Sequence, residues 1–272
     1  MQHKKIAFSD FHHLLEKRDR NANKSQFGHL LVIGGDEGMA GAPWLAALGG
    51  ARVGAGLVSI ATHAVHVNSV HYQPEIMCYG IRLAKEINPL LAKATVVVIG
   101  PGLGQSSWSK KLFKEVLKTQ LPIIIDADGL NLLASKAEVR RHWILTPHPG
   151  EAARLLNLSV DDIQQDRNQA VKELQKRYGG IVVLKGAGTL IKDEANMPLL
   201  CQQGNPGMAS AGMGDLLAGI IGGLIAQGLP LLEAAAFGVC LHAKAGDIAA
   251  EVGERGMLAT DLLPSVRKLV NL

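Results

Sequence analysis

The chain has 272 residues, of which 47% are hydrophobic, and this excludes a disordered chain and suffices for one large α/β domain. Lys and Arg outnumber Asp and Glu by 28 to 24, and the resulting net charge of +4 is too weak to indicate nucleic-acid binding. The 31 glycines exceed the usual share of about 7%, whereas aromatic residues make up only 4%. This bias predicts tight turns and close backbone approaches rather than an aromatic surface for base stacking.

Cysteine usage and hydropathy indicate the compartment. The three cysteines, Cys78, Cys201 and Cys240, show no metal-binding spacing, as expected in a reducing cytosol. The N-terminal segment lacks the apolar core of a signal peptide. The longest uncharged run, residues 216–232, is too short to span a bilayer and predicts a buried helix that ends near Gly228. These features predict a cytoplasmic protein with neither a membrane nor a nucleic-acid partner.

Apolar runs alternate with amphipathic patterns along the chain. The runs predict strands at 30–33, 57–60, 95–99, 122–125, 142–145 and 181–184. Helices are expected between them, at 110–118 and at 159–178, the latter with Ser159 as its N-cap. The last third predicts a hairpin of 189–191 and 198–201, then helices at 214–226, 231–250 and 260–269. Because no linker or repeat divides the chain, we expect a single α/β domain over residues 1–272.

The most distinctive motif, residues 205–215, precedes a predicted helix. Glycines there let backbone N–H groups converge on an anion, and we expect an anion hole at Ala211, Gly212, Met213 and Gly214. Asp215 could simply be a favourable charge at the helix start. A carboxylate beside a phosphate site repels phosphate, however, so we interpret Asp215 as a base that deprotonates a hydroxyl attacking phosphorus. No Lys-Ser/Thr pair follows the glycines, which excludes a P-loop.

A second glycine-rich turn follows the strand at 181–184. Residues 185–189 read KGAGT, which suits a nucleotide phosphate, with Lys185 as a point charge, backbone amides as donors and the hydroxyl of Thr189 nearby. An ordinary turn between strands is the alternative. Upstream, His148 lies between two prolines at a strand end, where it could contact a ligand or be structural. Pro149 and Glu151 suit the start of the next helix.

Three further segments lie at strand ends. Residues 100–105 resemble a dinucleotide fingerprint only weakly, because Gln105 occupies the third glycine position, and the glycines there would instead permit close approach to a ligand. Asp126 and Asp128 could hold Mg²⁺ through water or cap a helix. Gly41 and Ala42 begin a helix without bulk and leave room for a substrate. Close helix packing is predicted for the small residues that follow, Ala46, Ala47, Gly49 and Gly50. The remaining histidines are interpreted as structural or surface groups, and they include His63, His66, His71 and His242.

Taken in order, these segments resemble the NAD(P)H-hydrate dehydratase family of the ribokinase-like superfamily, from about Lys24 to Lys268. One departure from related kinases is visible, because Met213 stands where they usually carry threonine. The segments that carry the resemblance are the stretch from Gly34 to Pro43, GPGLG from Gly100, DADGLNLL from Asp126, TPHPGE from Thr146, KGAGT from Lys185 and NPGMASAGMGDLLAG from Asn205.

The resemblance implies a ribokinase-like three-layer α/β/α sandwich with a mostly parallel central sheet. It implies dehydration of the S epimer of NADH or NADPH hydrate, coupled to ADP or ATP with Mg²⁺, by phosphorylation of the hydrate hydroxyl and loss of phosphate. Asp215 would be the base and would contact the hydrate with Ala42, Gly104 and His148. The nucleotide would be held by Lys185, Gly186, Ala187, Gly188, Thr189 and Gly214.

The resemblance also implies a homotetramer and an NAD(P)H-hydrate epimerase on a separate chain, because 272 residues leave no room for that domain here. Two alternatives stay open. One is a ribokinase-like kinase for a vitamin precursor or sugar, which would share the anion hole and Asp215. The other is a nucleotide-binding module without catalysis. The choice between ADP and ATP, and between NADH and NADPH hydrates, does not follow from the residues.

Overall fold

The computed structural model describes residues 3–69, 73–135 and 137–272, so His71 lies outside the described residues. In this part of the chain, one ten-stranded sheet has the order β1-β10-β9-β8-β7-β6-β5-β2-β3-β4. β9 runs antiparallel to both of its neighbours, and all other neighbouring strands pair in parallel. The strands are β1 (Lys4–Ile6), β2 (His29–Ile33), β3 (Leu57–His63), β4 (Met77–Ile81), β5 (Val96–Ile99), β6 (Ile123–Ile125), β7 (Trp143–Leu145), β8 (Ile181–Leu184), β9 (Thr189–Lys192) and β10 (Leu199–Cys201).

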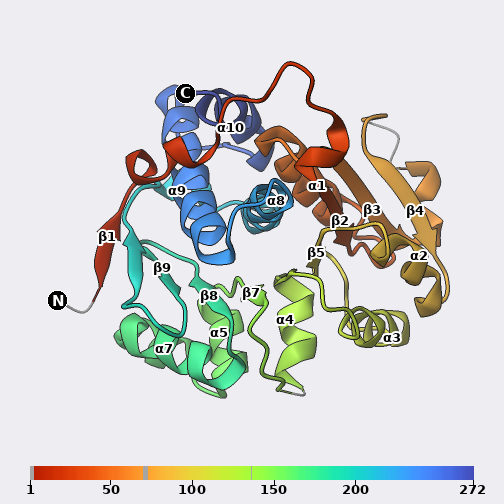
Figure 1. The fold of residues 1–272 in the computed structure, drawn as a ribbon. Helices are drawn as coiled ribbons and strands as arrows, with labels where there is room; N and C mark the ends of the chain where they lie inside the picture. The colour runs from red at the N-terminus through yellow and green to blue at the C-terminus, as the bar shows by residue number, and fades with distance from the viewer. Residues whose placement is uncertain (1–2, 70–72, 136) are drawn as a thin grey trace.

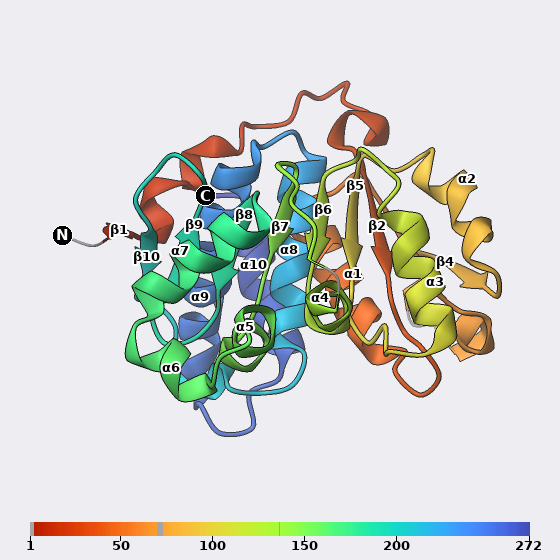
Figure 2. The ribbon, with the colours of Figure 1, turned by 90° about the horizontal axis from the view of Figure 1, so that it is seen from below.

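Helices cover both faces of the sheet, which gives the three layers that the sequence predicts (Figure 1; Figure 2). The first face carries α1 (Gly41–Val53), α8 (Met213–Ala226), α9 (Leu231–Ala249) and α10 (Leu263–Leu269). The second face carries α2 (Asn88–Leu91), α3 (Ser107–Val116), α4 (Ala127–Ala134), α5 (Pro149–Leu156), α6 (Val160–Gln165) and α7 (Arg167–Tyr178). Short 3₁₀ turns join several of these elements, η1 (Phe8–Asp10), η2 (His12–Leu14), η3 (Lys24–Phe27), η4 (Ala64–Ser69), η5 (Ala84–Ile87), η6 (Pro206–Met208), η7 (Ala250–Val252) and η8 (Ala259–Leu262).

The central strands are apolar along their whole length because each face of the sheet is covered. In β2, Leu30 and Val32 enter the core beneath α1 and α8, whereas Leu31 and Ile33 enter the core on the opposite face. All four side chains are fully buried. Continuous apolar strands of this kind are expected where helices pack on both sides of a parallel sheet.

The helices α1 and α8 pack backbone to backbone through glycines. A Cβ atom on Gly219 would collide with the carbonyl oxygen of Ala46, and one on Gly49 would lie 2.5 Å from the carbonyl oxygen of Leu216. The close helix packing predicted for residues 46–50 is therefore confirmed. This contact fixes α8, whose first turn carries the central motif of the sequence.

The predicted strands at 30–33, 57–60, 95–99, 122–125, 142–145 and 181–184 and the hairpin all form, and the short strands β1 and β4 join them without having been predicted. The prediction of one helix over residues 159–178 is wrong, because the chain breaks into α6 and α7 at Asp166. The side chain of Asp166 accepts a hydrogen bond from Gln169 N and so starts a new helix. Ser159 caps α6 as predicted. The C-terminal helix begins as a 3₁₀ turn at Ala259–Leu262.

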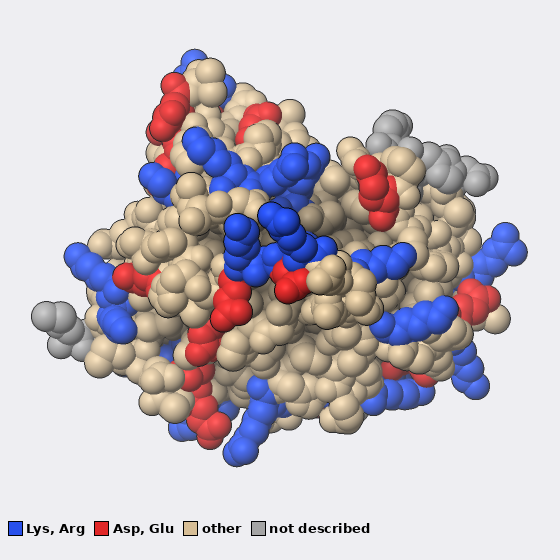
Figure 3. Space-filling model, turned by 45° about the horizontal axis from the view of Figure 1, so that its top comes forward, with Lys and Arg blue, Asp and Glu red and all other residues tan. Residues whose placement is uncertain are grey.

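Within the described residues, no helix combines the length and apolar character needed to cross a bilayer. Figure 3 shows several basic side chains gathered near the middle of the face that it presents, with acidic side chains beside them and toward the edges. Cys201 and Cys240 are buried and unpaired, and Cys78 is partly buried.

Candidate active site

Five loops that carry the predicted site residues follow five neighbouring strands. The strands β8, β7, β6, β5 and β2 are consecutive in the sheet and parallel. Their carboxyl ends therefore lie along one edge, where α/β proteins usually bind ligands. α8 begins beside this edge, because a Cβ atom on Gly214 would lie 3.0 Å from Lys185 Nζ. The topology thus gathers segments that lie as far apart in the sequence as Gly34 and Asp215.

A buried ion pair joins two of these strand ends. Lys185 Nζ, at the end of β8, donates to Asp126 Oδ1 at 2.7 Å. The hydroxyl of Thr146 donates to the same oxygen at 2.8 Å, and only 1% of Asp126 is exposed. Burial lowers the pKa of Lys185, but the charges of Asp126 and Glu151 outweigh that effect, so the net shift is upward. The predicted nucleotide lysine is therefore charged and held toward the middle of the site.

Glu151, in the first turn of α5, is a site residue that sequence reasoning treated only as part of a helix start. Its Oε2 accepts the backbone N–H of His148 at 2.7 Å and lies 3.9 Å from Lys185 Nζ. Burial raises the pKa of Glu151 to about 7, and the charge of Asp126 adds to this. A buried carboxyl group that shares a cation with Asp126 is the pattern expected of an active site. Its position three residues after His148, in a capping box, is the signal that could have identified it.

His148 is half exposed at the end of β7, and its ring orientation is fixed. Nδ1 accepts hydrogen bonds from Gly150 N at 3.0 Å and Glu151 N at 3.4 Å. Burial, followed by the charge of Lys185, lowers the pKa of His148. At neutral pH the ring is therefore neutral, and because Nδ1 is an acceptor, the proton is on Nε2. His148 can offer a donor to a ligand while its other nitrogen caps α5.

The first turn of α8 has the geometry of an anion-binding site. Gly212, which precedes the helix, adopts a φ of +86°, and its carbonyl oxygen accepts Leu216 N. The N–H groups of Met213, Gly214 and Asp215 therefore have no partner within the helix. Burial raises the pKa of Asp215 to about 7, the charge of Asp126 adds to this, and Lys185 opposes it. Asp215 can thus accept a proton near neutral pH.

The loop after β8 turns on two glycines in the left-handed region, Gly186 with φ of +137° and Gly188 with φ of +73°. The hydroxyl of Thr189 donates to the carbonyl oxygen of Gly186 at 3.1 Å, so it stabilises the turn. Ala187 is exposed at the loop tip. The guanidinium of Arg167, at the start of α7, also contacts this loop, and no motif in the sequence pointed to it.

Ala42, in the first turn of α1, and Gly104, in the loop after β5, belong to two segments that touch. A Cβ atom on Gly102 would lie 3.2 Å from the Cβ of Ala42, and one on Gly104 would lie 2.9 Å from Asp36 Oδ2. The backbone N–H of Gly104 donates to Asp128 Oδ2 at 2.9 Å, which ties this pair to the end of β6. Two of the four residues that the resemblance assigns to the hydrate, Ala42 and Gly104, are therefore in adjacent segments.

Asp126 and Asp128 lie where β6 ends and α4 begins. Neither side chain caps α4, so the capping interpretation is wrong. Asp126 binds Lys185, and Asp128 binds Gly104 and, at 3.3 Å, the side-chain amide of Asn131. Within the described residues, no three His, Cys, Asp or Glu side chains form a group that could hold a metal ion. One oxygen, Asp126 Oδ2, has no hydrogen-bond partner among these residues and could join a metal ion that a nucleotide brings with it.

His242 on α9 lies behind the first turn of α8. It is 6% exposed, and its Nε2 has no hydrogen-bond partner in the part of the chain that the structure describes. Burial lowers the pKa of His242 to about 4, with the charge of Lys185 acting in the same direction. The ring is therefore neutral, and it is buried as the structural interpretation expects.

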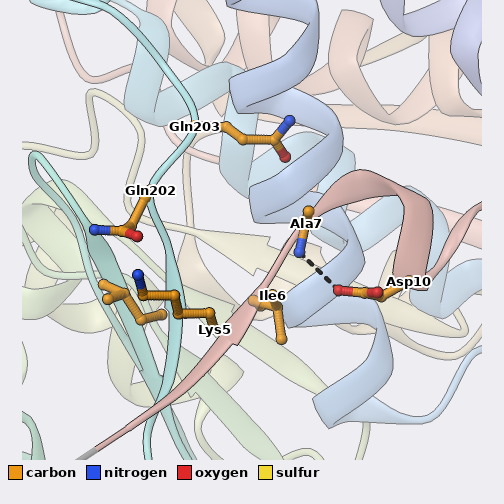
Figure 4. Close-up of a pocket in the computed structure, with 7 residues that line it drawn as sticks. Lys5, Ile6, Ala7, Asp10, Gln202 and Gln203 are labelled. Carbon is orange, nitrogen blue, oxygen red and sulfur yellow. Dashed lines mark hydrogen bonds between the residues drawn. The ribbon is translucent and has the colours of Figure 1, made fainter.

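Two pockets lie away from the candidate active site and are lined by other residues. One, of about 360 Å³, lies where β1 and β10 end, and there Ala7 N donates to Asp10 Oδ2 at 2.8 Å (Figure 4). The other, of about 420 Å³, follows α9. The first is lined by Lys5, Ile6, Ala7, Asp10, Leu200, Gln202 and Gln203, and the second by Ala249, Val252, Gly253, Arg255, Gly256, Met257, Thr260, Asp261 and Pro264. Neither includes a predicted site residue.

Comparison with known proteins points to one family. The family model described as NAD(P)H-hydrate dehydratase matches residues 30–268. The chain is 58% identical over 260 residues to the bifunctional NAD(P)H-hydrate repair enzyme of Coxiella burnetii, covering 95% of this chain and 53% of that protein. It is 38% identical over 274 residues to the ADP-dependent (S)-NAD(P)H-hydrate dehydratase of Neisseria meningitidis, covering 96% of this chain and 91% of that protein. The chain thus spans about half of the length of the bifunctional relative.

Solved structures agree with the sequence comparisons. A ribokinase-like superfamily protein of Enterococcus faecalis superimposes with a TM-score of 0.91 at 30% identity, covering 100% of this chain and 96% of that one. An ADP/ATP-dependent NAD(P)H-hydrate dehydratase of Bacillus subtilis, co-crystallised with ATP and Mg²⁺, gives a TM-score of 0.89 at 28% identity, covering 99% and 98%. The predicted ribokinase-like α/β fold is confirmed.

Proposed function

Because the chain belongs to the NAD(P)H-hydrate dehydratase family, we propose that it restores NADH and NADPH from the S epimers of their hydrates at the expense of ADP or ATP. The observation that carries this proposal is the position of Asp215. Its carboxyl group, with a pKa raised to about 7, lies in the first turn of α8 beside backbone N–H groups that can bind a phosphate. A base next to an anion site is what phosphorylation of a hydroxyl group requires.

In the first step, Asp215 takes the proton of the hydrate hydroxyl while its oxygen attacks the terminal phosphorus of the nucleotide. The bond from that phosphorus to the bridging oxygen breaks, and AMP leaves from ADP, or ADP leaves from ATP. Negative charge grows on the transferred phosphoryl group, where the N–H groups of Met213 and Gly214 and the ammonium of Lys185 would stabilise it. Ala211 and Gly212 complete the proposed anion hole.

In the second step, the C–O bond of the phosphorylated hydrate breaks and phosphate leaves. A proton passes from the neighbouring ring carbon to water, and the electron pair of that C–H bond forms the double bond of the dihydronicotinamide. Phosphate is a better leaving group than hydroxide, and this explains why a nucleotide is consumed. We propose that Ala42, Gly104 and the Nε2–H of His148 hold the ring for this step. The fixed tautomer of His148 supports its role as a donor.

The nucleotide would lie across the loop from Lys185 to Thr189, with Gly186, Ala187 and Gly188 offering backbone donors and Gly214 facing the terminal phosphate. We propose that Mg²⁺ accompanies the nucleotide and that Asp126 is its protein ligand, because both oxygens of Asp128 already accept hydrogen bonds. Bound Mg²⁺ would neutralise charge on the phosphates.

We also propose a homotetramer and a cytoplasmic location. The unpaired cysteines support that location, because such thiols are typical of reducing compartments. An NAD(P)H-hydrate epimerase would supply the S epimer. The prediction that the epimerase is on a separate chain stays a prediction, because the Coxiella burnetii relative is bifunctional and about twice as long as this chain.

The test follows the near-ultraviolet absorbance of reduced nicotinamide. Purified protein is incubated with a mixture of S and R NADH hydrates and ADP, ATP or no nucleotide. We expect absorbance to recover only with a nucleotide, to stop when the S epimer is used up, and to be matched by phosphate release. Consumption of nucleotide that leaves a phosphorylated hydrate would contradict the proposed elimination of phosphate. No reaction with either nucleotide would exclude the proposed function.

A further inference from the structure

The guanidinium of Arg167 bridges both ends of the loop between β8 and β9. Its Nη2 donates to the carbonyl oxygens of Leu184 at 3.1 Å, Lys185 at 3.2 Å and Gly188 at 3.2 Å. Its Nη1 donates to the side-chain oxygen of Gln164 at 3.2 Å. One side chain from α7 thus donates hydrogen bonds to three backbone carbonyl groups at the two ends of the loop that we assign to the nucleotide.

The donors of the same loop are left free. In the part of the chain that the structure describes, the N–H groups of Gly186, Ala187 and Gly188 have no hydrogen-bond acceptor. Successive free N–H groups on a turn with left-handed residues form a concavity that binds anions. Because a phosphate oxygen is repelled by carbonyl oxygens, holding the carbonyls on Arg167 makes the loop a site with donors only.

The charge of Arg167 is held by backbone and amide oxygens and not by a carboxylate. Arg167 is the first residue of α7, where the helix dipole disfavours a cation. Within the described residues, no carboxylate lies within 4.0 Å of its guanidinium. A Cβ atom on Gly186 would lie 3.0 Å from Nη1, so the glycine also makes room for this contact. The positive charge is therefore held against the loop without a neutralising partner.

We infer that Arg167 is a positioning residue for nucleotide binding, which clamps the carbonyls of Leu184, Lys185 and Gly188 so that the loop presents its N–H groups to a phosphate. The inference rests on the proposed function for the identity of that phosphate as part of ADP or ATP. A lysine could not replace Arg167, because a single ammonium group does not have the planar fork that reaches several fixed acceptors.

The experiment measures the dissociation constants of ADP and ATP by calorimetry without hydrate, and the KM values for nucleotide and hydrate in turnover. Arg167→Met should raise the nucleotide dissociation constant about tenfold or more, and Arg167→Lys should recover only a small part of that loss. The KM for the hydrate should change less than about twofold in both variants, because the clamp does not touch the hydrate loops. Lys172→Met is the matched control, since it removes a positive charge from an exposed position on the same helix.

Several results would overturn the inference. Binding of ADP by Arg167→Met as tight as by the wild type would contradict the clamp. Full binding by Arg167→Lys would reduce the role of Arg167 to its charge alone. A parallel rise in the KM for the hydrate would indicate a general structural role. Thermal unfolding is recorded for each variant, and Arg167→Gln replaces the methionine variant if that protein does not fold. A wild-type chain that binds neither ADP nor ATP would refute the proposed function instead, so the two failures are distinguishable.

Discussion

The ammonium of Lys185 and the carboxylate of Asp126 form a buried ion pair with an N–O distance of 2.7 Å, across two strands that are not adjacent in the sheet. β7 lies between them and contributes the hydroxyl of Thr146 to the same oxygen. The pair therefore joins the loops of β6 and β8 over the strand that carries His148.

Lys185→Met should destabilise the protein by about 3–5 kcal/mol, because it leaves the buried charge of Asp126 without a partner. The double variant Asp126→Asn with Lys185→Met should recover part of that loss, since it removes the stranded charge. Urea unfolding of the wild type, Lys185→Met, Asp126→Asn and the double variant at neutral pH measures both values. Additive losses in the double variant would show that the two groups do not stabilise each other.

Asp215→Asn should lower the rate of NADH recovery by about 10²–10⁴-fold, since asparagine cannot accept the hydroxyl proton. The dissociation constant of ADP should stay the same or fall, because a carboxylate that repels phosphate has been removed. Turnover under saturating substrates and calorimetry with ADP measure the two effects. A variant that keeps most of its activity would contradict the assignment of Asp215 as the base.

The same substitution should change how stability depends on pH. The pKa of Asp215 is raised to about 7 in the folded protein from an unfolded value near 4, so its protonated form favours folding. The contribution is fully present below about pH 4 and is lost as the pH rises through about 7. Asp215→Asn should therefore leave Tm nearly unchanged at pH 4 and raise it by several degrees at pH 8. Thermal scans of the wild type and the variant at both pH values measure this difference in Tm. An equal difference at the two pH values would exclude a raised pKa of Asp215.

Gly104→Ala should raise the KM for the hydrate by about tenfold or more and leave the KM for the nucleotide unchanged. The added Cβ would lie 2.9 Å from Asp36 Oδ2, in the loop that we assign to the hydrate. Gly38→Ala is the matched control, because Gly38 has a similar positive φ of +82° but no heavy atom within 4 Å of an added Cβ. Equal effects of the two substitutions would mean that backbone strain, not the contact, is responsible.

Gly219→Ala should destabilise the protein although alanine is the better helix former by about 1 kcal/mol. The added Cβ would collide with the carbonyl oxygen of Ala46 and lie 2.7 Å from its Cα, so α1 and α8 would have to separate. We expect a net loss of about 1–3 kcal/mol. Gly41→Ala, where nothing lies within 4 Å, should be neutral or slightly stabilising. Chemical unfolding of both variants makes the comparison.

The parts of the fold that the sequence predicts best are those whose pattern has a single physical explanation. Continuous apolar runs such as residues 30–33 form strands only if both faces are covered, and glycines followed by Asp215 suit only a helix start. The short strands β1 and β4 carry mixed residues at the ends of the sheet, so no periodicity identifies them. The break at Asp166 depends on a side-chain cap, which competes locally with a continuous amphipathic pattern.

The candidate site could be predicted wherever a motif marks a strand end, as at Asp126, His148 and Lys185. Their partnership could not, because it depends on the order of strands in the sheet, which the linear sequence does not contain. Glu151 is visible in the sequence only as a helix-start residue, and Arg167 only as one of many surface cations on an amphipathic helix. Glu151 acquires its role through Lys185, and Arg167 through the carbonyl groups of the loop after β8. Both contacts join a helix to the end of a different element.

The antiparallel strand β9 reverses the direction of the chain directly after the nucleotide loop. Its far end and the exposed turn at residues 194–197 therefore lie at the opposite edge of the sheet from Asp215 and Lys185. Polypeptide added at this turn would extend away from the active site. The turn connects β9 to β10, and these two short strands pair with each other. The turn is thus a natural attachment point for a fluorescent reporter or an affinity tag, and it makes the reaction observable in a labelled enzyme with an unaltered active site.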